Sequence, residues 1–330
     1  MAFIFLLFPA IALTQTKYHL LKTIPLAGDG SWDFLKVDSQ ARRLYISHDT
    51  KVTVLDVDTD QVVGEITGLD SVHGIAIARN LNRGYITNGR RSTVTCFDLN
   101  SLRVIAEIQT GKGPDAIAYD EGTGRVFAFN GKDHSATVID ASTNQVIGTV
   151  PLDAKPESAV TDGQGSLYVN LEDRNQVAQI DTQKLAVLNH WSVTPGESPS
   201  GLAMDPQSHR LFVGCANQML VILDSQNGKT IAHFPIGAHV DDVAFDAETG
   251  LIFSSNGDGT LTIIHEKSPS EFAETQTVET QLGARTMGLD KKTHNIYLAT
   301  AQFGPMNTAP NAHPRRPILP GTFVLLKVGP

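Results

Sequence analysis

A short, strand-like run of residues recurs along this chain at an interval of about 41 residues. Each copy is apolar and has an aromatic residue at its centre. The aromatics are Tyr45, Tyr85, Phe127, Tyr168, Phe212, Phe253 and Tyr297, so the steps are 40, 42, 41, 44, 41 and 44 residues. A period in this range is typical of propellers and solenoids, and it constrains the fold more than any other feature of the chain.

Each repeat contains four short apolar runs, which the second repeat shows clearly. Its runs cover residues 74–78, 84–87, 93–98 and 102–108. They are rich in Val, Ile, Tyr and Phe and are bounded by Gly, Asn, Asp and Ser, which is the chemistry of strands and turns. Four strands per unit favour a propeller over a solenoid with one strand per turn, and radial closure removes long exposed sheet edges.

Many of these runs end in aspartate. The third runs end in Asp56, Asp98, Asp140, Asp181 and Asp224, and the first runs end in Asp38, Asp120, Asp162, Asp205, Asp246 and Asp290. An aspartate at such a position can accept a hydrogen bond from the backbone two residues on and so start a turn. We therefore expect these side chains to have a structural role.

The two ends of the chain predict how the ring closes. The seventh unit ends at its third strand, 323–328, and lacks an outer strand, whereas residues 18–26 match the pattern of the outer run at 103–108. We predict that 18–26 pairs with 323–328. The predicted fold is an all-β, seven-bladed β-propeller of four-stranded blades, with residues 17–330 forming a single domain.

Residues 1–16 lie outside this strand count. Residues 2–13 are uncharged and almost wholly apolar, but they are shorter than the roughly 20 residues that a membrane-spanning helix needs. The segment fits the apolar core and cleavage region of a secretory signal, with small residues at Ala10 and Ala12. We expect a periplasmic or secreted protein without a transmembrane segment. The alternative is an ordinary buried strand.

Charge and cysteine content exclude some classes of function. The formal net charge is −9, which disfavours nucleic-acid binding, because that binding relies on Lys and Arg neutralising phosphate. The two cysteines, Cys96 and Cys215, fall in the second and fifth repeats, too far apart in a propeller for a disulfide. We expect two separate buried thiols, and a monomer.

Several repeat words resemble a known family. The run Gly-Tyr-Ile-Thr-Asn at 84–88 resembles the Tyr-Val-Thr-Asn word of YVTN-type β-propeller repeats. Residues 136–147 resemble the third and fourth strands of that family, and 113–118 and 198–203 resemble its first-strand entry. The resemblance to YncE-like proteins covers 17–330. It implies a seven-bladed, exported protein, and most members have no established activity. Some relatives bind DNA, but the acidic balance of this chain argues against carrying that over.

In a propeller, the innermost strands line a central channel, and their first residues lie at one mouth of it. Aligning the seven strand entries places one residue per blade at that mouth: Asp33, Gly74, Asp115, Glu157, Ser200, Asp241 and Arg285. His73, His239 and Asp242 lie nearby in sequence. Four carboxylates and one guanidinium around a ring form a candidate site for a cation or a small polar ligand.

Two interpretations of this ring remain open. Its charges could simply line a water-filled channel, as polar funnels do in many propellers. Alternatively, Asp115, Asp241, His239 and His73 could hold a divalent metal through oxygen and imidazole ligands. Crowded carboxylates could also raise one another's pKa enough for acid–base chemistry. We predict no organic cofactor, with a divalent cation as the alternative.

The loop between the second and third strands of the last repeat, 302–321, is far longer than its counterparts. Loops beyond about 12–15 residues are usually functional or disordered. One interpretation is a lid that brings His313, Arg315 and Arg316 over the acidic ring. The other is a proline-rich insertion without fixed structure.

Two classes of function follow. The favoured one is an exported, noncatalytic binding or scaffold protein that engages an unknown protein or a small polar ligand at the channel mouth. The alternative is a metal-assisted hydrolase or lyase, by analogy with lactonases and virginiamycin B lyase on similar scaffolds. The chain has no nucleophile elbow, phosphate loop or Cys-Xaa-Xaa-Cys pair, which favours the first.

Overall fold

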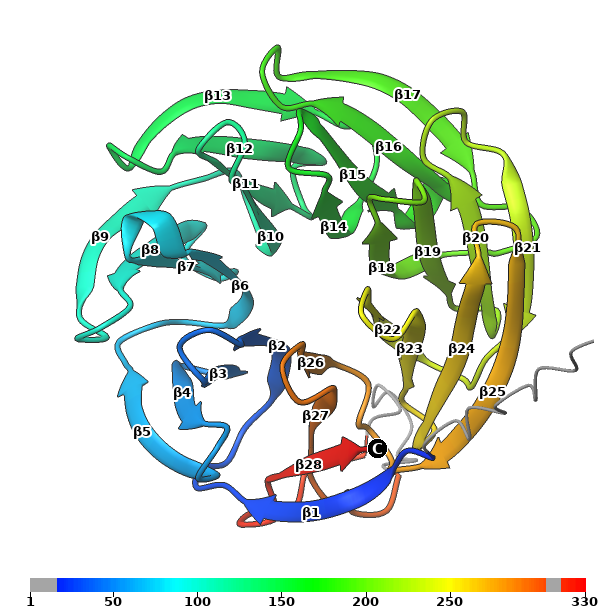
Figure 1. Cartoon of the computed structure of the whole chain (residues 1–330). Coiled ribbons are helices and arrows are strands. Elements are labelled where there is room, and N and C mark those ends of the chain that lie inside the picture. Colours follow the sequence, from blue (N-terminus) through cyan, green and yellow to red (C-terminus); the bar gives the residue numbers. More distant parts are fainter. Residues whose placement is uncertain (1–16, 307–315) are drawn as a thin grey trace, which may run out of the picture.

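The computed structural model describes residues 17–306 and 316–330. The expected signal segment, 1–16, and the lid residues His313 and Arg315 therefore lie outside the described residues. Seven four-stranded antiparallel sheets are arranged around a central channel (Figure 1). The all-β, seven-bladed propeller predicted from the repeat is confirmed.

The blades are numbered in chain order, and each is listed from its inner to its outer strand. Blade one contains β2 (Trp32–Asp38), β3 (Arg43–His48), β4 (Lys51–Asp56) and β5 (Gln61–Ile66). Blade two contains β6 (Val72–Ala78), β7 (Arg83–Asn88), β8 (Thr93–Asp98) and β9 (Val104–Gln109). Blade three contains β10 (Pro114–Asp120), β11 (Arg125–Asn130), β12 (Ser135–Asp140) and β13 (Gln145–Pro151). Blade four contains β14 (Pro156–Thr161), β15 (Ser166–Leu171), β16 (Gln176–Asp181) and β17 (Ala186–Ser192).

The remaining blades follow the same plan. Blade five contains β18 (Pro199–Asp205), β19 (Arg210–Cys215), β20 (Met219–Asp224) and β21 (Thr230–Pro235). Blade six contains β22 (Val240–Asp246), β23 (Leu251–Asn256), β24 (Thr260–Ser268) and β25 (Glu271–Glu279). Blade seven contains β26 (Met287–Asp290), β27 (Asn295–Thr300), β28 (Val324–Gly329) and β1 (His19–Pro25). Two single-turn 3₁₀ helices, η1 (Arg79–Leu81) and η2 (Glu172–Arg174), connect strands, and no helix in the described part is long and apolar enough to cross a membrane.

The ring closes where the two ends of the described chain meet. β1 pairs antiparallel with β28, from His19 opposite Gly329 to Pro25 opposite Val324. Figure 1 shows β1 as the outer strand beside β28. Tyr18 extends the closure into blade six, because its backbone N–H donates to Gln276 Oε1 over 3.0 Å. The predicted pairing of 18–26 with 323–328 is confirmed.

Apolar packing between blades forms the core. Seven buried clusters occupy the seven junctions between neighbouring blades, including the junction of blades seven and one. The repeated aromatics supply one buried ring to each junction: Tyr45, Tyr85, Phe127, Tyr168, Phe212, Phe253 and Tyr297. Truncating such a ring to alanine costs about 3–5 kcal/mol, so the repeated aromatic sets the blade-to-blade contact.

The aspartates at strand ends have the predicted structural role. After β4, for example, Asp56 Oδ1 accepts from the backbone N–H groups of Asp58 and Thr59 at 3.0 and 2.8 Å. Asp98, Asp140 and Asp181 repeat this pattern in the next three blades. The cysteines also behave as expected, because both are free and buried.

Candidate functional site

A distortion at the start of each inner strand positions the residues of the channel mouth. In blades one to six, the inner strand gains a register shift against its neighbour just after its first paired residue. In blade one, this shift lies between Trp32 and Leu35 and contains Asp33. A β-bulge of this kind re-aims a side chain, and here it places one residue per blade at the mouth.

The register corrects one position of the predicted ring. Trp32 pairs with His48, the last residue of β3, and Val72 pairs with Asn88, the last residue of β7. His73, which follows Val72, is therefore the equivalent of Asp33, whereas the sequence alignment gave that place to Gly74. The bulge accommodates an extra residue, and sequence alignment alone does not show which one. We use "mouth ring" for the resulting set: Asp33, His73, Asp115, Glu157, Ser200, Asp241 and Arg285.

Three members from consecutive blades form one group. His73 Nδ1 lies 2.5 Å from Asp33 Oδ2 and 3.7 Å from Asp115 Oδ1. The other ring nitrogen, Nε2, lies 3.2 Å from Ser71 Oγ. Donor atoms of Asp33, His73 and Asp115 all lie within 4.8 Å of one another. We call these three residues the donor triad.

The remaining ring residues pair among themselves or with a neighbour. Asp241 accepts from Arg285 Nε at 2.8 Å and from Ser200 Oγ at 3.0 Å. Glu157 pairs with Lys155 Nζ at 2.7 Å. The mouth ring therefore divides into a half with excess carboxylate around the donor triad and a half where a guanidinium compensates the charge.

Side chains of adjacent blades hold the backbone of the ring in place. Ser47 of blade one donates to the carbonyl of His73 over 2.5 Å, and Thr87 of blade two donates to the carbonyl of Asp115 over 2.6 Å. Thr286 of blade seven donates to the carbonyl of Asp33 over 2.9 Å. The donor triad is therefore built on rigid strands and does not depend on a loop.

The electrostatics of the ring follow from its crowding. Burial and the negative charge of Asp33 raise the pKa of Asp115 to about 6. Burial and the charge of Asp115 raise the pKa of Glu157 to about 7. Burial alone would lower the pKa of His73, but the hydrogen bond to Asp33 and the charge of Asp115 outweigh it, so this pKa is raised.

These values define what the donor triad can do. In the protonated form, the His73 imidazolium bridges two carboxylates. In the deprotonated form, two carboxylate oxygens and one imidazole nitrogen are available to a divalent cation, the ligand types that such ions accept in proteins. A proton and a divalent cation therefore compete for the same group.

Other predicted site residues lie elsewhere. Asp241 belongs to the Arg285 pair, and His239 is exposed beside Gly257, so neither joins His73 and Asp115. Arg316, the one predicted lid residue within the described range, lines a hollow together with Arg285 and His239. No ion pair joins Arg316 to a ring carboxylate, so its predicted contact with the acidic ring is not made there.

Sequence reasoning missed the charged side chains deeper in the channel. Lys36 and Lys291 line the same cavity as Asp242, which the sequence placed only in the neighbourhood of the ring. Lys36 lies three residues after Asp33 on the same strand, which was the one available signal. Lys291 follows the end of β26 and gave none.

Comparison with known proteins supports the fold. No family model matches the chain, and no curated protein matches it. Among solved structures, it is similar to Kuenenia stuttgartiensis hydrazine synthase, with a TM-score of 0.72 and 15% identity over 88% of this chain and 95% of that one. It is also similar to a chain of the mitotic checkpoint complex, with a TM-score of 0.73 and 13% identity over 90% and 94%. A third is the structure of U3-55K, with a TM-score of 0.77 and 9% identity over 94% and 98%.

These identities are low enough that the likeness shows the fold alone. With the blade count and the mouth ring, they define the chain as a seven-bladed β-propeller with a polar channel mouth.

Proposed function

We propose that this chain is an exported β-propeller binding protein of the YVTN/YncE-like type that takes a cationic ligand at its channel mouth. The observation that supports it most is the donor triad, whose donor atoms lie within 4.8 Å of one another. The backbone hydrogen bonds from Ser47, Thr87 and Thr286 preorganise these residues, which reduces the ordering cost of binding. Export rests on the apolar segment at 2–13 and on the family resemblance.

The ligand that the triad fits best is a divalent cation. Asp33, Asp115 and Glu157 crowd negative charge on one side of the mouth, and the only cation bonded to any of them besides His73 is Lys155, within the described ranges. A divalent ion would relieve the repulsion that raises the Asp115 and Glu157 pKa values. An acidic, partly enclosed mouth also attracts cations from a distance.

Metal binding by the purified protein tests this function. Titration with Mn²⁺ and with Zn²⁺ should raise the melting temperature of the wild-type protein, because an ion that binds only the folded state stabilises it. His73→Ala and Asp115→Asn should abolish the rise, whereas His233→Ala, at an exposed position of an outer strand, should retain it. A protein without metal after purification and without any response to these ions would contradict the proposal.

A metal-assisted hydrolase or lyase is the second candidate, and one observation favours it. Glu157, with its pKa raised to about 7, neighbours Asp115 of the triad and could exchange a proton near neutral pH. With metal bound, the triad would supply Lewis-acid chemistry, while Glu157 would hold or move the proton. Glu157→Gln should then abolish turnover of a lactone panel and leave metal binding intact. Absence of turnover in the metal-loaded wild type would leave binding as the function.

A further inference from the structure

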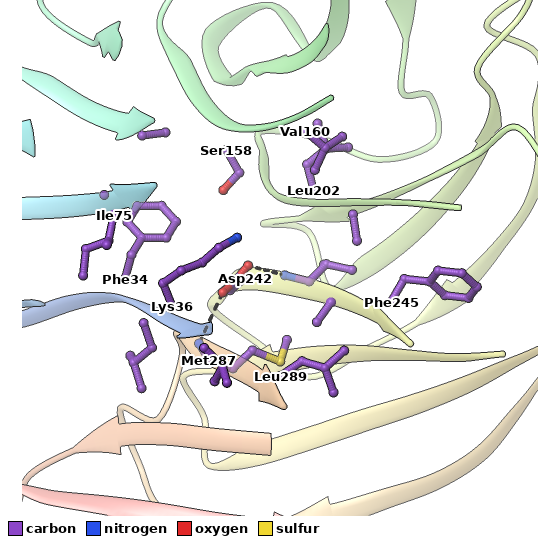
Figure 2. Close-up of a pocket in the computed structure, with 18 of the residues that line it drawn as sticks. Phe34, Lys36, Ile75, Ser158, Val160, Leu202, Asp242, Phe245, Met287 and Leu289 are labelled. Atoms are coloured by element: carbon purple, nitrogen blue, oxygen red, sulfur yellow. Dashed lines mark hydrogen bonds between the residues drawn. The ribbon is translucent and has the colours of Figure 1, made fainter. Parts of the chain in front are cut away.

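A second cavity lies in the channel beneath the mouth ring and differs from it in charge. Its volume is about 300 Å³, at the lower end of the range for small-molecule pockets. Figure 2 shows Lys36 extending across it, between Phe34 and Ile75 on one side and Asp242 on the other. A neighbouring space of about 350 Å³ continues the cavity and shares Lys36, Met204 and Lys291 with it.

The cavity carries an excess of positive charge. Within the described part of the chain, Lys36 and Lys291 are the only cationic residues that line it, and Asp242 is the only acidic one. Neither ammonium group has a hydrogen-bond or ion-pair partner among those residues. The protein that surrounds Lys36 and the charge of Lys291 both lower the Lys36 pKa, so the two ammonium groups repel each other.

Asp242 does not neutralise both lysines. Its carboxylate oxygens accept from the backbone N–H groups of Val243 at 2.9 Å and Met287 at 3.3 Å, so backbone donors already engage it. Even when Asp242 is ionised, two ammonium groups face one carboxylate. An anion between the lysines would remove their repulsion.

The rest of the cavity is apolar. Phe34, Ile75, Val160, Leu202, Phe245 and Leu289 are among its lining residues, and Ser39 and Ser158 are the only hydroxyl-bearing ones among those described. A hydrated inorganic anion would gain little from such walls. A small organic acid would place its carboxylate on the lysines and its carbon skeleton against the walls.

We propose that the channel is a binding site for a small organic carboxylate, whose charge pairs with Lys36 and Lys291 and whose apolar body packs on the channel wall. This site is separate from the donor triad and does not depend on it. The carboxylate enters from the face opposite the mouth ring, because the carboxylates of the ring repel it. On that opposite face, the strand-end aspartates Asp38, Asp120, Asp205, Asp246 and Asp290 are buried, and Asp162 is half-buried in its own turn.

Benzoate and hexanoate serve as probes, with benzamide and hexanamide as neutral isosteres. Ligand-observed NMR and calorimetry should detect binding of both acids to the wild type in the millimolar range, and weaker or no binding of the amides. Lys36→Met and Lys291→Met should each weaken acid binding about ten- to a hundredfold, as expected for the loss of a charge-assisted hydrogen bond. Lys229→Met, at an exposed position, should match the wild type.

Two further measurements make the result decisive. Lys36→Met should melt at or above the wild-type temperature, because the substitution removes an enclosed ammonium and keeps an apolar chain of similar length. Asp115→Asn at the mouth should leave benzoate affinity unchanged or slightly higher. Wild-type protein that binds neither acid, or lysine variants that bind both acids as the wild type does, would overturn the proposal.

Discussion

His73 Nδ1 lies 2.5 Å from Asp33 Oδ2, so a histidine of blade two and a carboxylate of blade one are joined at the channel mouth. They are 40 residues apart in the chain, one repeat length. The repeat brings equivalent positions together, and at these two positions it brings together an acid and a base. The protonation of this pair decides what else the mouth can bind.

Metal affinity of the donor triad should rise with pH. Hydrogen bonding to Asp33 raises the His73 pKa, and the Asp115 pKa is about 6, so a cation must displace protons from both groups at low pH. Below these pKa values, affinity should increase about tenfold per pH unit for each proton displaced, and it should level off above them. Calorimetry with Mn²⁺ at several pH values measures this, and an affinity independent of pH would contradict it.

The junction of blades seven and one should depend on Arg42. Its guanidinium donates to both carboxylate oxygens of Asp290 at 2.7 Å, and the Asp290 side chain is fully buried. Arg42→Met leaves that carboxylate without its partner and should cost about 3–5 kcal/mol of unfolding free energy in urea. Arg103→Met, at an exposed position without side-chain contacts among the described residues, should stay within about 0.5 kcal/mol of the wild type.

The same pair predicts acid sensitivity. Burial would raise the Asp290 pKa, but hydrogen bonds from Arg42 and Thr293 outweigh it and lower the value to about 2. The unfolded state therefore binds more protons than the folded state between the ordinary carboxyl pKa, about 4, and about 2. The stabilisation is complete above this window and is lost as the pH falls through it. Asp290→Asn should remove this part of the acid dependence in urea titrations at several pH values.

Asp242 should have the opposite pH dependence. Burial raises its pKa from 3.8 to about 7, so the folded state holds a proton that the unfolded state has released between these values. Unfolding free energy should fall as the pH rises from about 5 to about 8. Asp242→Asn should reduce this fall by on the order of 1 kcal/mol, because water in the channel screens the charge.

The comparison variant for Asp242 is Glu121→Gln, an exposed position that should keep the wild-type pH profile. Asp115 and Glu157 titrate in the same range, so the wild-type profile will retain part of its slope in Asp242→Asn. A profile identical to that of the wild type would show that Asp242 is ionised throughout.

Removal of β1 should abolish cooperative folding. Without residues 17–26, β28 loses its outer partner and Tyr18 no longer packs on Phe253, whose ring centre lies 5.2 Å away. A chain that begins at residue 27 should lose the single sharp melting transition, which circular dichroism measures. A chain that begins at residue 17 is the matched control, because all seven blades are complete from there. An unchanged transition in the shorter chain would show that closure does not need β1.

The sequence predicted the fold well because the same local chemistry occurs seven times. Alternating apolar residues, a central aromatic and turn-forming aspartates each agree with a four-stranded blade, and repetition removes the ambiguity of any single copy. The closure by 18–26 followed from counting strands. The mouth ring followed from the same alignment, except in blade two, where His73 takes the place assigned to Gly74.

The misassigned position and the missed residues share a physical cause. A β-bulge admits an extra residue, so the residue that reaches the mouth depends on pairing with the next strand. Lys36 and Lys291 meet in the channel although 255 positions separate their numbers, and no local pattern encodes that meeting. The Arg42–Asp290 pair spans 248 residues in the same way.

The sequence by itself therefore determined the blade, the number of blades and the partner of the last strand, because these depend on local patterns and on their count. Only the tertiary structure decided which side chains converge in the channel: the donor triad at the mouth and the two lysines beneath it. Radial closure brings strand starts from distant repeats to within a few ångströms, and the bulges and the junctions between blades then set which side chains meet.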